Sequence, residues 1–196
     1  MSQDDMTKVQ ARTLKTRAKL LAAAQEVVAD IGFEALRVEQ VVAKAGVAKG
    51  TFFAHFKDKD ALMEQLIAPV VDSYLDELEM RPAPRSVEEI VEALTPVIRF
   101  MTAERYVFDV ILRHSGAAAK EEIGPIAQNF YRTQFALAPW LAKGPFRKDI
   151  SAELLADGLG AFLIQAMALN FCALHNERTI EDQLTIYLKA WLQPAL

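Results

Sequence analysis

The 196-residue chain is 52% hydrophobic and 24% charged, with 8 glycines, 8 prolines and a formal net charge of −4. This composition allows a sizeable core and excludes a disordered or fibrous protein, and the single cysteine, Cys172, excludes a disulfide framework and a multi-cysteine zinc site. The first residues do not resemble a signal peptide, and the apolar run at 158–169 is too short and too interrupted to span a membrane. We therefore expect a soluble cytoplasmic protein that does not enter membranes.

Apolar residues recur at three- and four-residue spacings along almost the whole chain, which predicts an all-α protein of about nine helices. Asp58, Ser86 and Thr179 are expected N-caps, and the Arg-Pro-Ala-Pro segment at 81–84 is expected to break a helix. One of the helices is expected to be about 39 Å long. The expected helices cover residues 13–31, 38–45, 49–55, 58–80, 86–101, 104–114, 120–141, 150–175 and 179–193.

Residues 33–62 contain two helices that are too short to be stable alone, joined by a tight turn at Gly46. The second helix has small and hydrogen-bonding groups at its exposed N-terminal end, which suits insertion into the major groove of DNA. The spacing fits a surface helical hairpin equally well. The side chains that this second helix presents are Lys49, Thr51, Phe53 and His55.

The charge is distributed unevenly along the chain. Residues 1–57 contain 9 basic and 6 acidic residues and carry +3, whereas residues 58–196 contain 13 basic and 20 acidic residues and carry −7. A basic N-terminal part on an acidic remainder is the asymmetry expected if only the first part meets phosphate.

The run GVAKGTFFAHFKDKDAL at residues 46–62 resembles the recognition helix and fourth-helix start of the TetR family of repressors. Gly-Phe-Glu-Ala at 32–35 is similar to the link between that family's first two helices. The resemblance covers residues 13–62, about a quarter of the chain, and the rest is similar in helix number and length only. It implies a three-helix helix-turn-helix DNA-binding domain at 1–57 and a C-terminal helical domain at 58–196 that binds an effector and dimerises.

The implied function is transcriptional regulation, as a homodimeric repressor that binds palindromic operator DNA and is released by a small-molecule ligand, with no cofactor and no metal. Lys49, Thr51 and His55 lie where the family contacts bases and nearby phosphates, and Lys59 lies where it pairs a lysine with a phosphate. Arg17 is a weaker phosphate candidate, for which an ordinary exposed arginine is as good an interpretation. The complete expected set of DNA-binding residues is Arg17, Arg37, Lys49, Gly50, Thr51, Phe53, His55 and Lys59.

Three positions depart from the family pattern. Arg37 stands where a serine or threonine usually caps the second helix, Ala48 replaces a serine, and Phe53 replaces a phosphate-binding tyrosine. Losing a cap costs about 1 kcal/mol, and Arg37 compensates if it makes a charge-assisted phosphate contact. The alternative function is a helical ligand-binding protein with weakened or lost DNA binding. An enzyme is not expected, because the sequence lacks a phosphate-binding loop, a zinc-protease motif and a nucleophile elbow.

The last two helices are expected to form the dimer interface. A stripe of small residues on the helix at 150–175 would let another helix approach closely, although packing within one chain explains the same stripe. Cys172 and His175 are not expected to bind a metal, because two residues on one helix leave further ligands to find. The stripe consists of Ala152, Ala156, Gly160, Ala168 and Cys172.

Aromatic and polar side chains in the C-terminal part predict a cavity between helices that binds an apolar or aromatic small molecule. A core or surface role is the alternative for each of them. The expected pocket residues are Phe100, Phe108, His114, Phe130, Gln134, Phe162, Gln165 and Met167.

Overall fold

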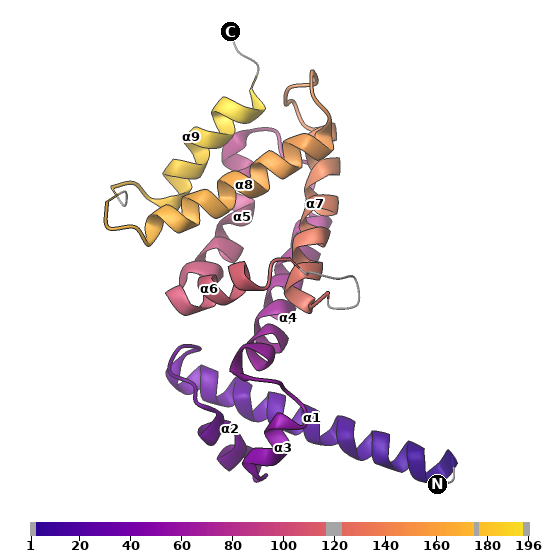
Figure 1. The fold of residues 1–196 in the computed structure, drawn as a ribbon. Helices are drawn as coiled ribbons and strands as arrows, with labels where there is room; N and C mark the ends of the chain where they lie inside the picture. The colour runs from indigo at the N-terminus through magenta and orange to yellow at the C-terminus, as the bar shows by residue number, and fades with distance from the viewer. Residues whose placement is uncertain (1–2, 117–122, 175–176, 194–196) are drawn as a thin grey trace.

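A computed structural model describes residues 3–116, 123–174 and 177–193, with side chains from residue 10 onward. Within these ranges the regular structure is entirely helical, which confirms the all-α class. Figure 1 shows α1 to α3 at one end, which we call the head, and α5 to α9 at the other, which we call the body, with α4 running from one into the other. The helices are α1 (Gln3–Ile31), α2 (Val38–Ala45), α3 (Lys49–Phe53), α4 (Lys59–Met80), α5 (Val87–Thr102), α6 (Arg105–Arg113), α7 (Pro125–Lys143), α8 (Ala152–Asn170) and α9 (Ile180–Leu192).

The three expected N-caps are present. Asp58, Ser86 and Thr179 each accept a hydrogen bond from the backbone N–H three residues further on, at 2.8, 3.2 and 3.0 Å. These bonds satisfy amide groups that have no partner within the helix, and they set the starts of α4, α5 and α9.

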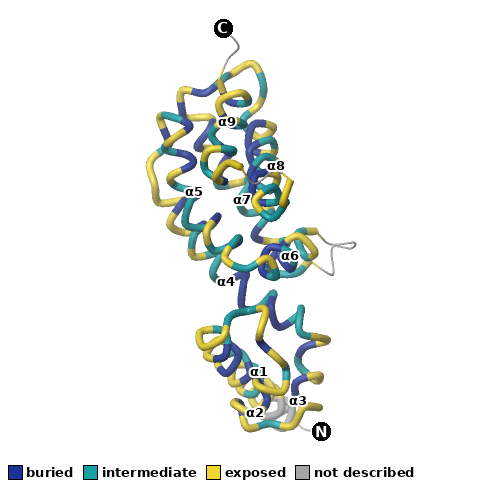
Figure 2. Tube along the Cα trace, turned by 90° about the vertical axis from the view of Figure 1, so that its left-hand side faces the viewer, coloured by how far each residue is buried: buried dark blue, intermediate teal, exposed yellow. Residues whose placement is uncertain are grey.

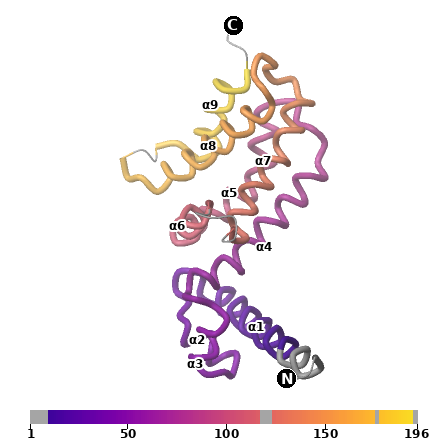
Figure 3. Tube along the Cα trace, turned by 45° about the vertical axis from the view of Figure 1, so that its right-hand side comes forward, coloured from indigo at the N-terminus to yellow at the C-terminus, as the bar shows by residue number. Residues whose placement is uncertain are grey.

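Two helices of the head differ in length from the expectation. Helix α1 begins at Gln3 and not at residue 13. Figure 3 shows the coloured part of α1 running beside α2 and α3. Residues 10–15 are exposed, so this part of the helix has no apolar face for a periodicity argument to detect. Helix α3 ends at Phe53, two residues early.

Two helices of the body are shorter than expected. Helix α7 begins at Pro125, consistent with the preference of proline for the first turn, and residues 117–122 lie outside the described part of the chain. Helix α8 ends at Asn170, where the N–H of Cys172 turns back to the carbonyl of Leu169 at 2.9 Å. Its 19 residues span about 28 Å, shorter than the expected length. His175, expected within this helix, lies outside the described residues.

The head has a small core of its own, visible in Figure 2 as buried segments facing one another. Leu20 and Ala24 of α1, Val41 of α2 and Phe52 of α3 are completely buried there. Gly46 joins α2 to α3 in the left-handed conformation, with φ +60° and ψ +44°, and its N–H donates to Ala43 and Val42 carbonyls. The expected turn is therefore present, and it needs glycine because other residues rarely adopt this φ.

Helices α8 and α9 approach each other closely at Gly158. A Cβ atom at this position would lie 2.4 Å from the Trp191 indole, whose Nε1 donates to the Leu155 carbonyl at 3.1 Å. Phe162 of α8 stacks on Tyr187 of α9 with 5.1 Å between ring centroids. This contact depends on a glycine that is not part of the expected small-residue stripe.

One helix among those described, α8, is long and apolar enough to cross a membrane by length and composition alone. The sequence predicts that the apolar run at 158–169 is too short to span a membrane. The result for α8 differs because the helix as a whole is longer than that run. Core helices of soluble proteins have the same composition, and α8 packs between α7 and α9 (Figure 1).

The substitution Gly158→Ala should lower the free energy of unfolding by about 1–3 kcal/mol, because the new methyl group overlaps the Trp191 ring. Urea unfolding followed by far-UV circular dichroism, at one fixed protein concentration, measures the change. The matched control is Gly160→Ala on the same helix, where no atom lies within 4 Å of the added Cβ. It should raise stability by up to about 1 kcal/mol through helix propensity. Equal effects at both positions would contradict the packing at Gly158.

Candidate nucleic-acid interface and ligand cavity

Helix α3 leaves one side open to solvent. Lys49 and Gly50 are exposed, no atom lies within 4 Å of the Cβ position of Gly50, and Phe53 keeps 50% of its surface exposed. Thr51 and His55 are half-buried beside them. The five expected recognition-helix residues therefore lie together around a short helix at the far end of the head.

Lys49 is engaged with an acidic neighbour. Its Nζ lies 2.6 Å from Glu39 Oε1 of α2, and both side chains are mostly exposed. The hydrogen bond from Lys49 lowers the pKa of Glu39 below its ordinary value. Exposed pairs of this kind contribute little to stability, so a phosphate can displace Glu39 at little cost.

Arg17 holds α3 against α1. Its Nη1 donates to the His55 carbonyl at 2.8 Å, and its guanidinium lies 4.5 Å from the centroid of the Phe56 ring. This position differs from that of an ordinary exposed arginine, and a role toward phosphate stays a prediction.

Arg37 folds back onto its own loop, where its Nη1 donates to the carbonyls of Glu34 and Leu36 at 2.9 and 3.2 Å. Its backbone N–H donates to Gln40 Oε1 at 2.7 Å. Gln40 therefore supplies one half of a capping box, and the Arg37 guanidinium makes no side-chain cap. A phosphate contact by Arg37 would require the guanidinium to leave these carbonyls.

Lys59 lies at the contact between head and body and is half-buried. Its Nζ donates to the Glu34 carbonyl at 3.0 Å and lies 4.3 Å from the centroid of the Tyr106 ring. Burial of the ammonium group, together with the nearby positive charge of Arg37, lowers its pKa from the ordinary value. The Tyr106 hydroxyl donates to Asp60 at 3.1 Å, so the first turn of α4 is fastened to α6.

A carboxylate that the sequence analysis did not single out completes this junction. Glu104, which precedes α6, accepts hydrogen bonds from the backbone N–H groups of Phe33 and Glu34 at 2.9 and 2.8 Å. Gly32, with φ +83°, lets the carboxylate approach, because a Cβ there would lie 2.9 Å from Glu104 Oε1. These hydrogen bonds therefore hold the link between α1 and α2 against the body.

A cavity of about 1270 Å³ lies in the body among α4, α5, α7 and α8. The second half of α4, from Val71 to Leu78, contributes to its wall, as does Arg81 just beyond the helix. Of the expected pocket residues, Phe130 and Gln134 line it. Ala156 and Gly160 of the expected dimer stripe also line it, so this part of the stripe faces the interior of the chain.

The other six expected pocket residues do not line this cavity. Sequence identifies aromatic and polar side chains on a helix but does not tell which face of the helix meets the cavity. Phe100 contacts Phe33 and Tyr74, Phe108 packs on Phe171, His114 pairs with Glu64, Phe162 stacks on Tyr187, Gln165 is exposed, and Met167 is completely buried.

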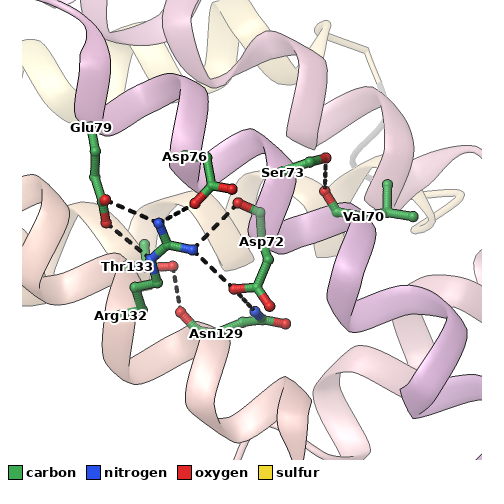
Figure 4. Close-up of polar contacts among 8 residues, drawn as sticks. All are labelled: Val70, Asp72, Ser73, Asp76, Glu79, Asn129, Arg132 and Thr133. Carbon is green, nitrogen blue, oxygen red and sulfur yellow. Dashed lines mark hydrogen bonds and ion pairs between the residues drawn. The ribbon is translucent and has the colours of Figure 1, made fainter.

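An ionic cluster joins α7 to α4 (Figure 4). The Arg132 guanidinium donates to Asp72 at 3.1 Å, to Glu79 at 3.0 Å and to Asp76, and these hydrogen bonds, chiefly that to Glu79, raise its pKa. Asn129 Nδ2 also donates to Asp72, at 2.8 Å. The three carboxylates share one face of α4 at helical spacing, a signal that the sequence contains but that its analysis did not use.

Cys172 is half-buried just beyond the end of α8. His175, its proposed neighbour, lies outside the described residues. Among the residues that are described, no group of three or more His, Cys, Asp or Glu side chains is placed to hold a metal ion.

Comparison with known proteins gives consistent results. Residues 20–66 match the family described as "Bacterial regulatory proteins, tetR family". The chain is 30% identical over 148 residues to the uncharacterized HTH-type transcriptional regulator YvdT of Bacillus subtilis, an alignment that covers 73% of this chain and 71% of YvdT.

Two solved structures share the fold. Thermus thermophilus FadR, a TetR family transcriptional repressor in complex with lauroyl-CoA, superimposes with a TM-score of 0.62 at 18% identity, over 89% of this chain and 92% of FadR. The SmeT–triclosan complex has a TM-score of 0.59 at 19% identity, over 92% and 93% of the two chains, and SmeT is the repressor of a Stenotrophomonas maltophilia multidrug efflux pump.

The substitution Arg17→Ala should loosen α3, because it removes the hydrogen bond to His55 and the contact with the Phe56 ring. We expect faster amide hydrogen exchange at residues 52–56 and a loss of about 1–2 kcal/mol in unfolding free energy. Lys15→Ala, at an exposed position on the same helix, is the control and should change neither quantity. Unchanged exchange in Arg17→Ala would show that the contact does not hold α3.

Proposed function

Because the chain belongs to the TetR family and is a transcriptional regulator of that family, we propose that it is a cytoplasmic, homodimeric repressor released from palindromic operator DNA by a small apolar ligand. The observation that carries this proposal is the course of α4. One helix bears Lys59 at its first residue, beside the expected DNA-binding surface. Its second half lines the cavity with Val71, Tyr74, Leu75, Glu77 and Leu78.

DNA binding by the head is supported by its charge and by the open side of α3. The head carries net positive charge on an otherwise acidic chain, and phosphate contacts depend on such charge. We assign Lys49, Gly50, Thr51, Phe53 and His55 to the DNA-contacting surface. The division into a DNA-binding domain at 1–57 and an effector and dimerisation domain at 58–196 is part of this proposal.

A homodimer through α8 and α9 is supported by unburied apolar surface. Helix α8 is apolar, yet only 33% of the residues in its most apolar 18-residue window are buried within one chain. Leu154 of α8 and Ile186 of α9 are exposed large hydrophobic side chains. A second copy packed on these outer faces would remove this surface from water.

Ligand binding is supported by the size and lining of the cavity. Its volume exceeds the range of about 300–1,000 Å³ that is usual for small-molecule sites, and most of its lining residues are apolar. Two proteins of the same fold bind lauroyl-CoA and triclosan.

A ligand would act on DNA binding through α4 and the Glu104 contact. Two recognition helices of a dimer must lie about 34–36 Å apart to enter successive major grooves. Displacement of the cavity-lining half of α4 would turn the head, which Glu104 holds by the amides of Phe33 and Glu34. The altered spacing would prevent both recognition helices from docking.

The second candidate is a ligand-binding protein with weak or absent DNA binding. It is favoured by the intramolecular contacts of Arg37 and Lys59, which occupy groups expected to meet phosphate. The repressor is the better proposal, because these contacts are hydrogen bonds to exposed or partly exposed carbonyls and a DNA phosphate offers each group a charged acceptor instead.

The proposal predicts that the protein shifts DNA from upstream of its own gene in a gel assay, and that ligand and operator compete. Triclosan, lauroyl-CoA and other apolar compounds are first screened for an increase in melting temperature. The ligand found is then titrated with and without operator. Operator should lower the affinity of the protein for the ligand by the same factor by which the ligand lowers its affinity for operator. Equal ligand affinity in both titrations would refute release by ligand, and no shift at low salt would refute DNA binding.

The substitution Lys59→Ala should weaken binding to every DNA sequence, because it removes one phosphate contact. The slope of log affinity against log salt should fall by about 0.9. Lys143→Ala, at an exposed position in the last turn of α7 and outside the proposed DNA-binding and dimer surfaces, is the control and should leave affinity and slope unchanged. Thr51→Ala should instead change the preferred sequence. An unchanged slope for Lys59→Ala would remove Lys59 from the interface.

A further inference from the structure

The positive charge of the head comes from α1. Residues 6–25 contain five basic and no acidic residues, whereas residues 26–57, which include α2 and α3, contain four of each. The two aspartates at positions 4 and 5 account for the rest of the net charge of residues 1–57. The segment that contains the helix-turn-helix is therefore neutral as a unit, and the charge that attracts phosphate lies on the helix before it.

The basic residues of α2, of α3 and of the loop before α2 are engaged within the protein. Lys44 Nζ lies 2.9 Å from Glu26 Oε2. Lys49 pairs with Glu39, and Arg37 donates to carbonyls of its own loop. A phosphate therefore meets these cations only after it displaces a partner that is already present.

Three basic side chains of α1 have no such partner. Arg12, Lys15 and Lys19 are spaced three and four residues apart, so they share one face of the helix, and all three are exposed. Within the described part of the chain, none of these side chains forms a hydrogen bond or an ion pair. The three positions span about 10 Å along the helix axis. We call this row the basic face of α1.

The basic face begins beside the helix-turn-helix and leads away from it along α1. Lys19 Nζ lies 3.8 Å from the position that a Cβ atom on Gly46 would occupy, in the turn that precedes α3. Figure 1 shows α3 and the N-terminal part of α1 at the same end of the molecule, opposite the C-terminus. The cations of the basic face are therefore placed to meet phosphates that neighbour the groove entered by α3.

A nucleic acid fits this face better than a membrane surface does. A helix that lies on a membrane needs a large apolar face beside its basic one. Between residues 10 and 19 the only large apolar side chain is that of Leu14. A row of cations without apolar neighbours matches instead the repeating charge of a DNA duplex, which carries one phosphate per about 1.7 Å of its length.

From this charge distribution and geometry we propose that the basic face of α1 is a second DNA-contacting surface, which binds backbone phosphates beside the site that α3 enters. The inference rests on the proposed DNA-binding function and adds Arg12, Lys15 and Lys19 to the interface. Contacts to phosphate carry no direct sequence information. The basic face therefore supplies affinity for any duplex, and α3 supplies the choice of sequence.

The test compares the double variant Arg12→Gln, Lys15→Gln with the wild-type chain, on a mixed-sequence duplex and on DNA from upstream of the gene. Fluorescence anisotropy between about 50 and 200 mM salt gives the slope of log affinity against log salt. The slope should fall by about 1.8 per head on both duplexes, since each lost phosphate contact removes about 0.9. The matched control, Arg85→Gln, Lys143→Gln, changes the net charge equally at exposed positions of the body and should keep the wild-type slope. Arg12→Lys, Lys15→Arg keeps both charges and should keep the slope as well.

A second measurement uses the wild-type chain alone, so the proposal stays falsifiable if a variant misfolds. Lysines are acetylated with acetic anhydride, with and without the mixed-sequence duplex, and the modified sites are identified by mass spectrometry. Bound DNA should slow acetylation severalfold at Lys15 and Lys19 and leave it unchanged at Lys143, which is exposed on the body.

Three results would overturn the inference and leave DNA binding by α3 in place. They are an unchanged slope for the double variant, an equal loss of slope in the control, and acetylation of Lys15 and Lys19 that bound DNA does not slow. If the wild-type chain binds neither duplex even at low salt, the inference and the proposed DNA-binding function are overturned together.

Discussion

The hydrogen bonds from two backbone amides to the Glu104 carboxylate are the contact on which the relation between head and body depends. Apart from α4 itself, the two parts meet where Glu104 and α6 contact the α1–α2 link and the first turn of α4, and where Phe33 contacts Phe100 of α5. The Glu104 bonds are charge-assisted and made to backbone, so they do not depend on side-chain rotamers in the head. Gly32 lets the carboxylate reach these amides.

This junction explains why groups expected at a DNA interface lie partly within the protein. The Lys59 ammonium lies between the Glu34 carbonyl and the Tyr106 ring, at the junction to which Glu104 also belongs. Any displacement of α6 therefore changes the surroundings of Lys59 as well. The proposed phosphate contact and the proposed ligand response share residues for this reason.

Features that depend on a few neighbouring residues could be predicted from the sequence, including the caps at Asp58 and Thr179 and the left-handed turn at Gly46. The length of α8 was overestimated, because the apolar residues continue beyond the turn that ends the helix. The partners of Glu104 lie 70 and 71 residues away in the sequence, and those of Arg132 lie 53 to 60 residues away. Such contacts depend on how helices pack, so neither the junction nor the ionic cluster between α4 and α7 could be derived from local pattern.

The helix that joins the two sites contains a proline, Pro69, between Lys59 and the cavity-lining residues. Proline has no N–H group, so the carbonyl of Gln65, four residues earlier, lacks its helical hydrogen bond, and the helix is weakest against bending at this point. If α4 bends at Pro69, its two halves act as a lever with a pivot there, not as a rigid rod. A displacement of the cavity wall would reach the head as a rotation about this pivot, and its amplitude would grow with distance from Pro69.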